Sequence, residues 1–190
     1  MARPRSDDKR NAILSAAIQI FAERGLSAPT SAISNLAGIA EGTLFTYFKT
    51  KDDLLNALYR EIKLELADAM MSGFPRKKSV RTKLRHIWDR YTTWGVTHPD
   101  QRKVLSQLQL SGSLTLESKK AGSAPFSEIE AMSKEAVEQR ILRDIPLEFL
   151  AATMDASAQT TMSFMAAHST SAEKFQRLGF ETFWKGISKK

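Results

Sequence analysis

The chain of 190 residues contains no cysteine. It therefore has no thiols to form a disulfide, a cysteine-ligated zinc site or a thiol nucleophile. No stretch approaches the roughly eighteen apolar residues that a transmembrane helix needs. The basic opening segment is not followed by the apolar run of a signal peptide. These absences predict a cytoplasmic protein that has no membrane partner.

Patterns of catalytic residues are also scarce. His86, His98 and His168 lie far apart in the sequence and make no metal-binding spacing. The sequence has no G-x-S-x-G motif and no glycine-rich phosphate loop. The acid pairs Asp7-Asp8 and Asp52-Asp53 open expected helices, where the helix dipole favours carboxylates. The sequence predicts no enzyme, no metal and no cofactor.

Charge and apolar periodicity are informative. Lys and Arg number 28 against 21 Asp and Glu, a net charge of +7, which favours an anionic partner. Apolar residues repeat at helical spacing, and no stretch alternates for long enough to predict a strand. We therefore expect an all-α fold of about nine helices, over approximately residues 7–24, 30–37, 43–48, 51–72, 80–97, 99–110, 126–142, 147–167 and 171–187. The stretch around 116–121 also fits a short helix.

Residues 30–48 have the pattern of two short helices joined by a tight turn. Gly38 suits the reversal because glycine adopts positive φ without a Cβ penalty. In the second helix, Leu44 and Phe48 share one side and are assigned to the core. Polar or amphipathic residues, including Thr46 and Tyr47, occupy another side. This pattern predicts a helix-turn-helix, whose second helix enters the DNA major groove.

The N-terminal arm, with Arg3 and Arg5, has two interpretations that remain open: a disordered terminus, or a segment that touches DNA phosphate.

The motif residues are Gly25, Ile33, the run AGIAEGTLFTYF from Ala37 to Phe48, and KDDL from Lys51 to Leu54. Because of these motif residues, about the first 55 residues resemble the N-terminal region of the TetR family of transcriptional repressors. The chain also resembles the multidrug-sensing RamR branch. That likeness rests on MARPRSDDK, EGTLFTYFKTKDDLLNALY, Ile87-Trp88 to Trp94-Gly95 with His98-Pro99, and Leu178–Glu181 with Trp184. The resemblance to the TetR family implies a homodimer in which ligand binding changes the spacing of the two DNA-reading helices.

The resemblance also implies DNA contacts at nine positions. Hydroxyls and Lys51 suit phosphate, and Thr46 or Tyr47 suits phosphate or a thymine methyl. Glu41 costs energy near phosphate unless it reads a cytosine amine or turns away. Ser31 is short where relatives carry a long basic side chain, and Phe45 fits either core packing or contact. The DNA-binding candidates are Thr30, Ser31, Glu41, Gly42, Thr43, Phe45, Thr46, Tyr47 and Lys51.

For ligand binding, the resemblance points to Tyr59 and Trp88, and helical spacing adds neighbours. Aromatic and Met side chains suit a hydrophobic, flat aromatic or cationic effector. Met154 and Ala151 depart from the branch, so the effector's identity is not transferred. Asp155 fits either a counter-charge for a cationic ligand or a polar spot at the dimer seam, with the seam favoured. The ligand candidates are Tyr59, Ile62, Leu66, Trp88, Tyr91, Met132, Ala136, Met154 and Asp155.

The last two expected helices share a stripe of small and apolar residues. Such a stripe lets helices approach closely, and two helices from each subunit would form a four-helix dimer interface. Packing within one chain is the alternative. The dimer candidates are Ala158, Thr161, Met165, Phe175, Gly179, Thr182 and Phe183.

Together these patterns predict a DNA-binding domain over 1–51 and a ligand-binding and dimerisation domain over 52–190. The expected function is transcription regulation by a repressor that binds a palindromic operator in double-stranded DNA as a homodimer. A small aromatic or cationic molecule would release it. The alternative is a DNA-binding or architectural protein of the same fold that ignores ligands.

Overall fold

The computed structural model describes residues 4–189. Arg3 and the side chain of Arg5 lie outside the described residues, so both interpretations of the arm stay open. Over the described range the chain forms α-helices, two short 3₁₀ turns and no strand, which confirms the all-α prediction. The helices are α1 Pro4–Arg24, α2 Thr30–Leu36, α3 Glu41–Tyr47, α4 Lys51–Met71, α5 Val80–Thr97, α6 Pro99–Leu110, α7 Leu116–Ser123, α8 Ser127–Glu138, α9 Leu147–Ala167 and α10 Ala172–Ile187. The helix α7 occupies the stretch that fitted a short additional helix. None of the helices in residues 4–189 combines the length and apolar character needed to cross a bilayer.

Packing divides the chain into two compact units. The first comprises the described residues up to Leu64 together with Pro99–Ser123. The second comprises Glu65–His98 and the described residues from Ala124 onward. The helix α4 begins in the first unit and ends in the second. The predicted boundary after residue 51 lies inside the first unit, and as a functional division it stays a prediction.

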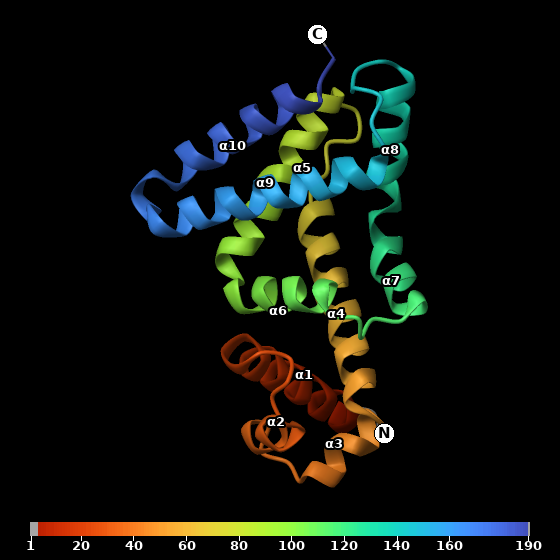
Figure 1. The fold of residues 1–190 in the computed structure, drawn as a ribbon, viewed down its shortest axis with the longest axis vertical. Coiled ribbons are helices and arrows are strands. Elements are labelled where there is room, and N and C mark those ends of the chain that lie inside the picture. The colour runs from red at the N-terminus through yellow and green to blue at the C-terminus, as the bar shows by residue number, and fades with distance from the viewer. Residues whose placement is uncertain (1–3, 190) are drawn as a thin grey trace. The chain divides into compact units, whose positions relative to one another are not determined.

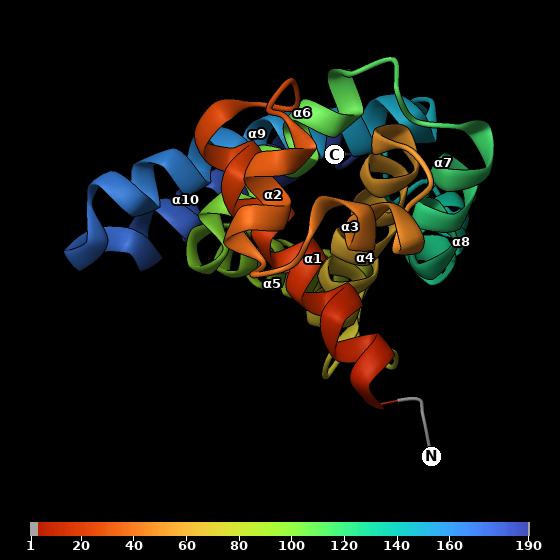
Figure 2. The ribbon, with the colours of Figure 1, turned by 90° about the horizontal axis from the view of Figure 1, so that it is seen from below.

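In the first unit, α1 packs against α2 and α6 (Figures 1 and 2). Its buried apolar stripe includes Ile13, Ala17 and Phe21, at the spacing of one helix face. Gly25 ends α1 with φ +80°, the left-handed conformation that glycine adopts most readily. The sequence pattern thus explains both the face that α1 buries and the point where it ends.

In the second unit, α9 and α10 lie side by side as a hairpin, and α5 packs against both (Figure 1). Trp88 of α5 is fully buried, and its ring stacks on Phe183 with 5.5 Å between centroids. The helix α8 ends at Glu138, earlier than expected, because Arg140 takes φ +59° and turns the chain. The following residues run beside the C-terminal segment, where Leu142 bridges to Ser188.

Candidate nucleic-acid interface

The helices α2 and α3 are joined by a turn of four residues, Ala37 to Ala40. Ala37 N–H bonds to the Ile33 carbonyl, and Ile39 N–H bonds to the Ser34 carbonyl at 3.0 Å. Gly38 lies between them with φ +67°, as the sequence predicted. A Cβ at Gly38 would meet no atom within 4 Å, so its left-handed backbone conformation, and not lack of space, favours glycine.

One side of this helix pair is packed. Ile33 and Leu44 are fully buried and Phe48 nearly so, which confirms the assignment of Leu44 and Phe48 to the core. Ser34 is buried too, and its hydroxyl donates to the Ser31 carbonyl at 3.1 Å. Each short helix is therefore fixed by its apolar side, because helices of seven residues are not stable alone.

The opposite side carries the predicted DNA-binding residues. Phe45 has 39% of its surface exposed, so the structure does not bury it in the core. Contact of Phe45 with DNA stays a prediction. Glu41, Gly42 and Thr46 are also exposed, whereas Thr30, Ser31, Thr43, Tyr47 and Lys51 are partly exposed. All nine candidates thus lie on or beside α2 and α3 with accessible surface.

Glu41 has a specific partner. The hydroxyl of Thr30, the first residue of α2, donates to Glu41 Oε1 at 2.7 Å. Glu41 is the first residue of α3, so this bond joins the starts of the two helices. The sequence named both residues as DNA contacts and gave no signal that they contact each other.

Lys51 also has internal partners. Its Nζ donates to the Ala28 carbonyl at 2.7 Å and lies 5.8 Å from the centre of the Phe21 ring. An ammonium group has three donors, so it retains donors for a phosphate oxygen. Lys51 therefore secures the start of α4 to the loop before α2 in addition to its predicted role.

The start of α4 is capped reciprocally. Asp53 N–H donates to Thr50 Oγ1 and Thr50 N–H donates to Asp53 Oδ2, both at 3.0 Å. This arrangement satisfies two backbone donors at once, as in a capping box. The cap predicted at Thr50 is confirmed, and it fixes the start of α4 at Lys51.

A polar cluster beyond the predicted residues fixes α7 to α4. Asn56 is buried; its Nδ2 donates to the Ser113 carbonyl at 2.9 Å, and its Oδ1 accepts from Thr115 N–H at 2.9 Å. Arg60 donates to the hydroxyl of buried Ser118 at 2.5 Å. A surface hollow of about 560 Å³ lies beside these residues and reaches Tyr47. The sequence signal for this cluster is a lone Asn, Asn56, inside the apolar stripe of α4.

The predicted ligand residues fall in both units. Tyr59 and Ile62 belong to the first, and the other seven belong to the second. Tyr59 packs on α7, since a Cβ built on Gly122 would lie 2.5 Å from its ring. Burial raises the pKa of Tyr59 above its ordinary value of 10.0. Ile62, Leu66, Met132 and Ala136 are buried and Met154 is partly exposed.

Trp88 and Tyr91 already have protein partners. Trp88 donates its indole N–H to the Gln176 carbonyl at 3.0 Å and is in contact with the close-packed Gly179. The hydroxyl of Tyr91 donates to Asp155 Oδ1, and Gln159 Nε2 lies 3.5 Å from both oxygens. The Asp155 carboxylate therefore contacts α5 of its own chain, and both of its interpretations, a counter-charge for a ligand and a polar spot at the dimer seam, stay predictions.

Four of the predicted dimer residues face inward. Ala158, Thr161, Met165 and Phe183 are buried within one chain. A Cβ on Gly179 would lie 2.2 Å from Thr161 Oγ1 and 2.7 Å from Trp88 Cζ2. The close approach of α10 to α9 and α5 at Gly179 packs this part of the stripe inside the chain, and the role of the stripe in a dimer stays a prediction. Phe175 and Gly179 are partly exposed, and Thr182 is exposed.

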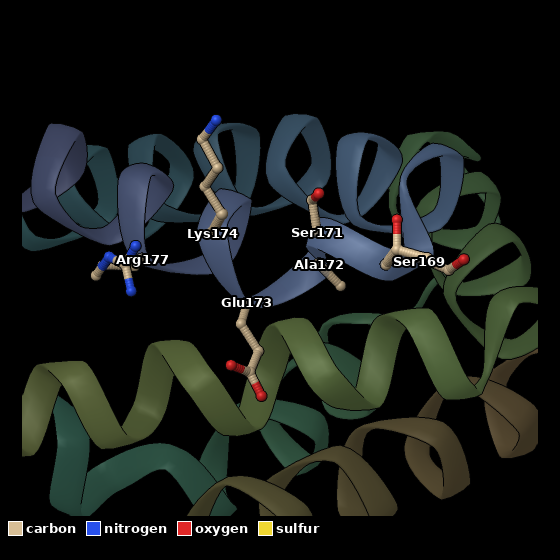
Figure 3. A pocket seen from close by; sticks show the side chains of 7 residues that line it. Ser169, Ser171, Ala172, Glu173, Lys174 and Arg177 are labelled. Carbon is tan, nitrogen blue, oxygen red and sulfur yellow. The ribbon is translucent and has the colours of Figure 1, made fainter.

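A second hollow, of about 400 Å³, lies at the turn between α9 and α10. Figure 3 shows Lys174 and Glu173 projecting in opposite directions from this turn, so the labelled side chains do not converge on a common point. None of the predicted ligand residues lines either hollow. These two hollows therefore give no support to the predicted ligand set.

The fold and the surface of α3 define a helical protein with a helix-turn-helix, a motif that reads DNA through its second helix. Residues 13–58 match the model of the bacterial regulatory proteins of the tetR family. Residues 13–58 are thus similar to the tetR family of bacterial regulatory proteins, and the structural neighbours show that the chain has the all-α fold of TetR-family structures.

Among curated proteins, the fatty acid metabolism regulator protein of Bacillus subtilis (strain 168) is 34% identical over 73 residues. The match spans 38% of this chain and 38% of that relative. A TetR family transcription regulator from Marinobacter aquaeolei VT8 has the same fold, with TM-score 0.90, 22% identity and coverage of 99% and 100% of the two chains. The TetR-like regulator LfrR from Mycobacterium smegmatis, in complex with proflavine, has TM-score 0.69, 18% identity and coverage of 96% and 99%.

Proposed function

We propose that the protein is a cytoplasmic transcriptional repressor that binds a palindromic operator as a homodimer. The observation that carries this proposal is the pair α2 and α3, which is packed on one side and carries eight of the accessible candidate residues, with the ninth, Lys51, at the start of α4. The second helix of such a pair enters the major groove, and its early residues meet base edges. Two copies held about 34–36 Å apart would read two half-sites one helical turn apart.

The dimer surface in this proposal is the outer face of α9 and α10. Phe164 is 48% exposed and Leu178 50% exposed, and Phe164 lies 5.3 Å from the Phe175 ring. Small exposed residues, Ala156 and Thr160, lie on α9. An apolar group with small neighbours lets a second copy approach closely. Leu178→Glu is expected to shift the dimer to monomer in light scattering, whereas Lys185→Gln on the same helix, which changes the net charge by the same −1, is the control.

We also propose that a small hydrophobic or aromatic molecule releases the operator, as in the RamR-like branch that the sequence resembles. Trp88 remains the residue proposed to meet it, with a rearrangement of its present packing. The bound proflavine of LfrR supports this chemistry by analogy of fold alone. A regulator without a ligand response is the second candidate, and the complete burial of Trp88 favours it.

The test of DNA binding is a gel shift with the DNA that flanks the gene, repeated from low to high salt. Affinity is expected to fall steeply with salt because phosphate contacts release counterions. Tyr47→Ala is expected to weaken binding while the dimer stays folded. Salt-independent binding, or wild-type affinity in Tyr47→Ala, would contradict the proposal.

The test of the effector uses proflavine as the probe and tryptophan fluorescence as the readout. Proflavine is expected to quench the wild-type protein and to release operator DNA. Quenching of equal size in Trp88→Phe would remove Trp88 from the site. Retention of DNA at every proflavine concentration would support the ligand-independent candidate for this chemical class.

A further inference from the structure

An exposed acid occupies the first position of the helix that is proposed to read DNA. Glu41 is exposed at the start of α3, close to where phosphates would lie. A carboxylate there is repelled by phosphate unless it accepts a hydrogen bond that compensates. A carboxylate at this position that contacts only solvent would weaken binding to DNA, so its presence calls for a specific partner.

The carboxylate is held in one orientation. The Thr30 hydroxyl donates to Oε1 at 2.7 Å, so Thr30 fixes the side chain from the neighbouring helix. Among the residues that the structure describes, none donates a hydrogen bond to Oε2 of Glu41, so this oxygen can accept one from DNA. A neighbour with a long side chain would compete for the same base edge, but Ser31 is short.

The bases differ in what they offer this oxygen in the major groove. Cytosine presents its N4 amine as a donor, whereas guanine N7 and O6 and thymine O4 are acceptors that repel a carboxylate. Adenine has the N6 amine, but its adjacent N7 is an acceptor. Cytosine therefore matches a carboxylate with one free oxygen better than the other three bases.

We propose that Glu41 is a specificity-determining residue that accepts a hydrogen bond from a cytosine N4 amine in each operator half-site, with Thr30 as its positioning residue. The proposal rests on the proposed DNA-binding function. Glu41 Oε1 stays bonded to Thr30, and Oε2 accepts from the base.

The experiment selects binding sites from randomised double-stranded DNA with the full-length protein. The wild type is expected to select a palindrome with one cytosine position that depends on Glu41. Glu41→Gln is expected to change that position to adenine, because an amide accepts from N6 and donates to N7. Glu41→Ala is expected to lose the preference at that position alone, by about tenfold or more.

Thr30 is tested in the same selection. Thr30→Val is expected to reduce the cytosine preference while the other positions keep theirs, and Thr30→Ser, which retains the hydroxyl, is expected to restore it. A role in folding alone would weaken every position equally. Thermal unfolding of each variant shows whether it is folded.

The outcomes separate this proposal from the function on which it rests. If the wild type selects no sequence, the DNA-binding function fails. If it selects a palindrome and Glu41→Ala and Glu41→Gln select the same one, the reading of cytosine by Glu41 is overturned. If Thr30→Val keeps the full preference, Thr30 is not the positioning residue.

Discussion

Two helix pairs in this chain use small and apolar residues in opposite ways. In α2 and α3, Ile33 and Leu44 are buried on one side, while Leu36 and Phe45 keep exposed surface. In α9 and α10, four residues of the stripe that the sequence assigned to a partner copy, Ala158, Thr161, Met165 and Phe183, are buried within the chain.

The difference shows what a stripe of small residues means. Such residues indicate that something approaches closely, and Gly179 meets Trp88 and Thr161 of its own chain. They do not indicate whether the neighbour belongs to the same chain or to another copy. The exposed large residues Phe164 and Leu178 are more informative about a partner, because the chain leaves them uncovered.

The largest expected effect separates two adjacent residues of α3. Leu44→Ala removes a fully buried side chain and is expected to lower the free energy of unfolding by about 2–5 kcal/mol. Phe45→Ala is expected to change stability far less and to weaken operator binding. Thermal unfolding and gel shifts measure both. Equal loss of stability in the two variants would remove the distinction between the two faces of α3.

In the hairpin, Gly179→Ala is expected to lower the free energy of unfolding by about 1–3 kcal/mol, because its Cβ overpacks Thr161 and Trp88. Gly186→Ala on the same helix is the matched control, since the Cβ of the new alanine would have no neighbouring side chain or other segment within 4 Å. The control is expected to be neutral or stabilising, as alanine favours helix. Unchanged unfolding of Gly179→Ala, measured by circular dichroism, would contradict the close packing.

The cap of α4 provides a smaller effect. Thr50→Ala removes the acceptor for Asp53 N–H and is expected to cost about 1 kcal/mol of unfolding free energy. Thr46→Ala is the control, because its hydroxyl only bonds back to the Gly42 carbonyl within α3. Denaturant unfolding compares the two. A loss at Thr46 as large as that at Thr50 would show that the cap is not the cause.

The smallest expected effect is on the stability of the fold at alkaline pH. Burial raises the pKa of Tyr59 above 10.0, so the folded chain resists ionisation that the unfolded chain permits. The stability from this difference is present below about pH 10 and is lost as pH rises through the folded-state pKa. Tyr59→Phe is expected to lose less stability between pH 9 and 11, as measured by melting temperature. Parallel losses in both proteins would contradict a buried phenol.

Local sequence patterns predicted much of the fold. The all-α class, the turn at Gly38, the end of α1 at Gly25 and the cap at Thr50 all depend on residues close together in the chain. The burial of Leu44 and Phe48 followed from their spacing of one helical turn. These features were predictable because a few neighbouring residues determine them.

Features that join distant segments were not predictable. The bond between Thr30 and Glu41 spans eleven positions, and that between Asn56 and Ser113 spans 57. The inward face of the α9 stripe depends on where α5 and α10 pack. Periodicity gives the face of a helix, but it does not give the identity of the neighbour.

The capped start of α4 has a mechanical consequence. Only Phe48, Lys49 and Thr50 separate α3 from α4, and the first of these is buried while the last is held by its reciprocal bonds. This connection is therefore short and fixed at both of its ends. We therefore expect a rotation of the first turn of α4 to change the orientation of α3, because the short connection is fixed at both ends.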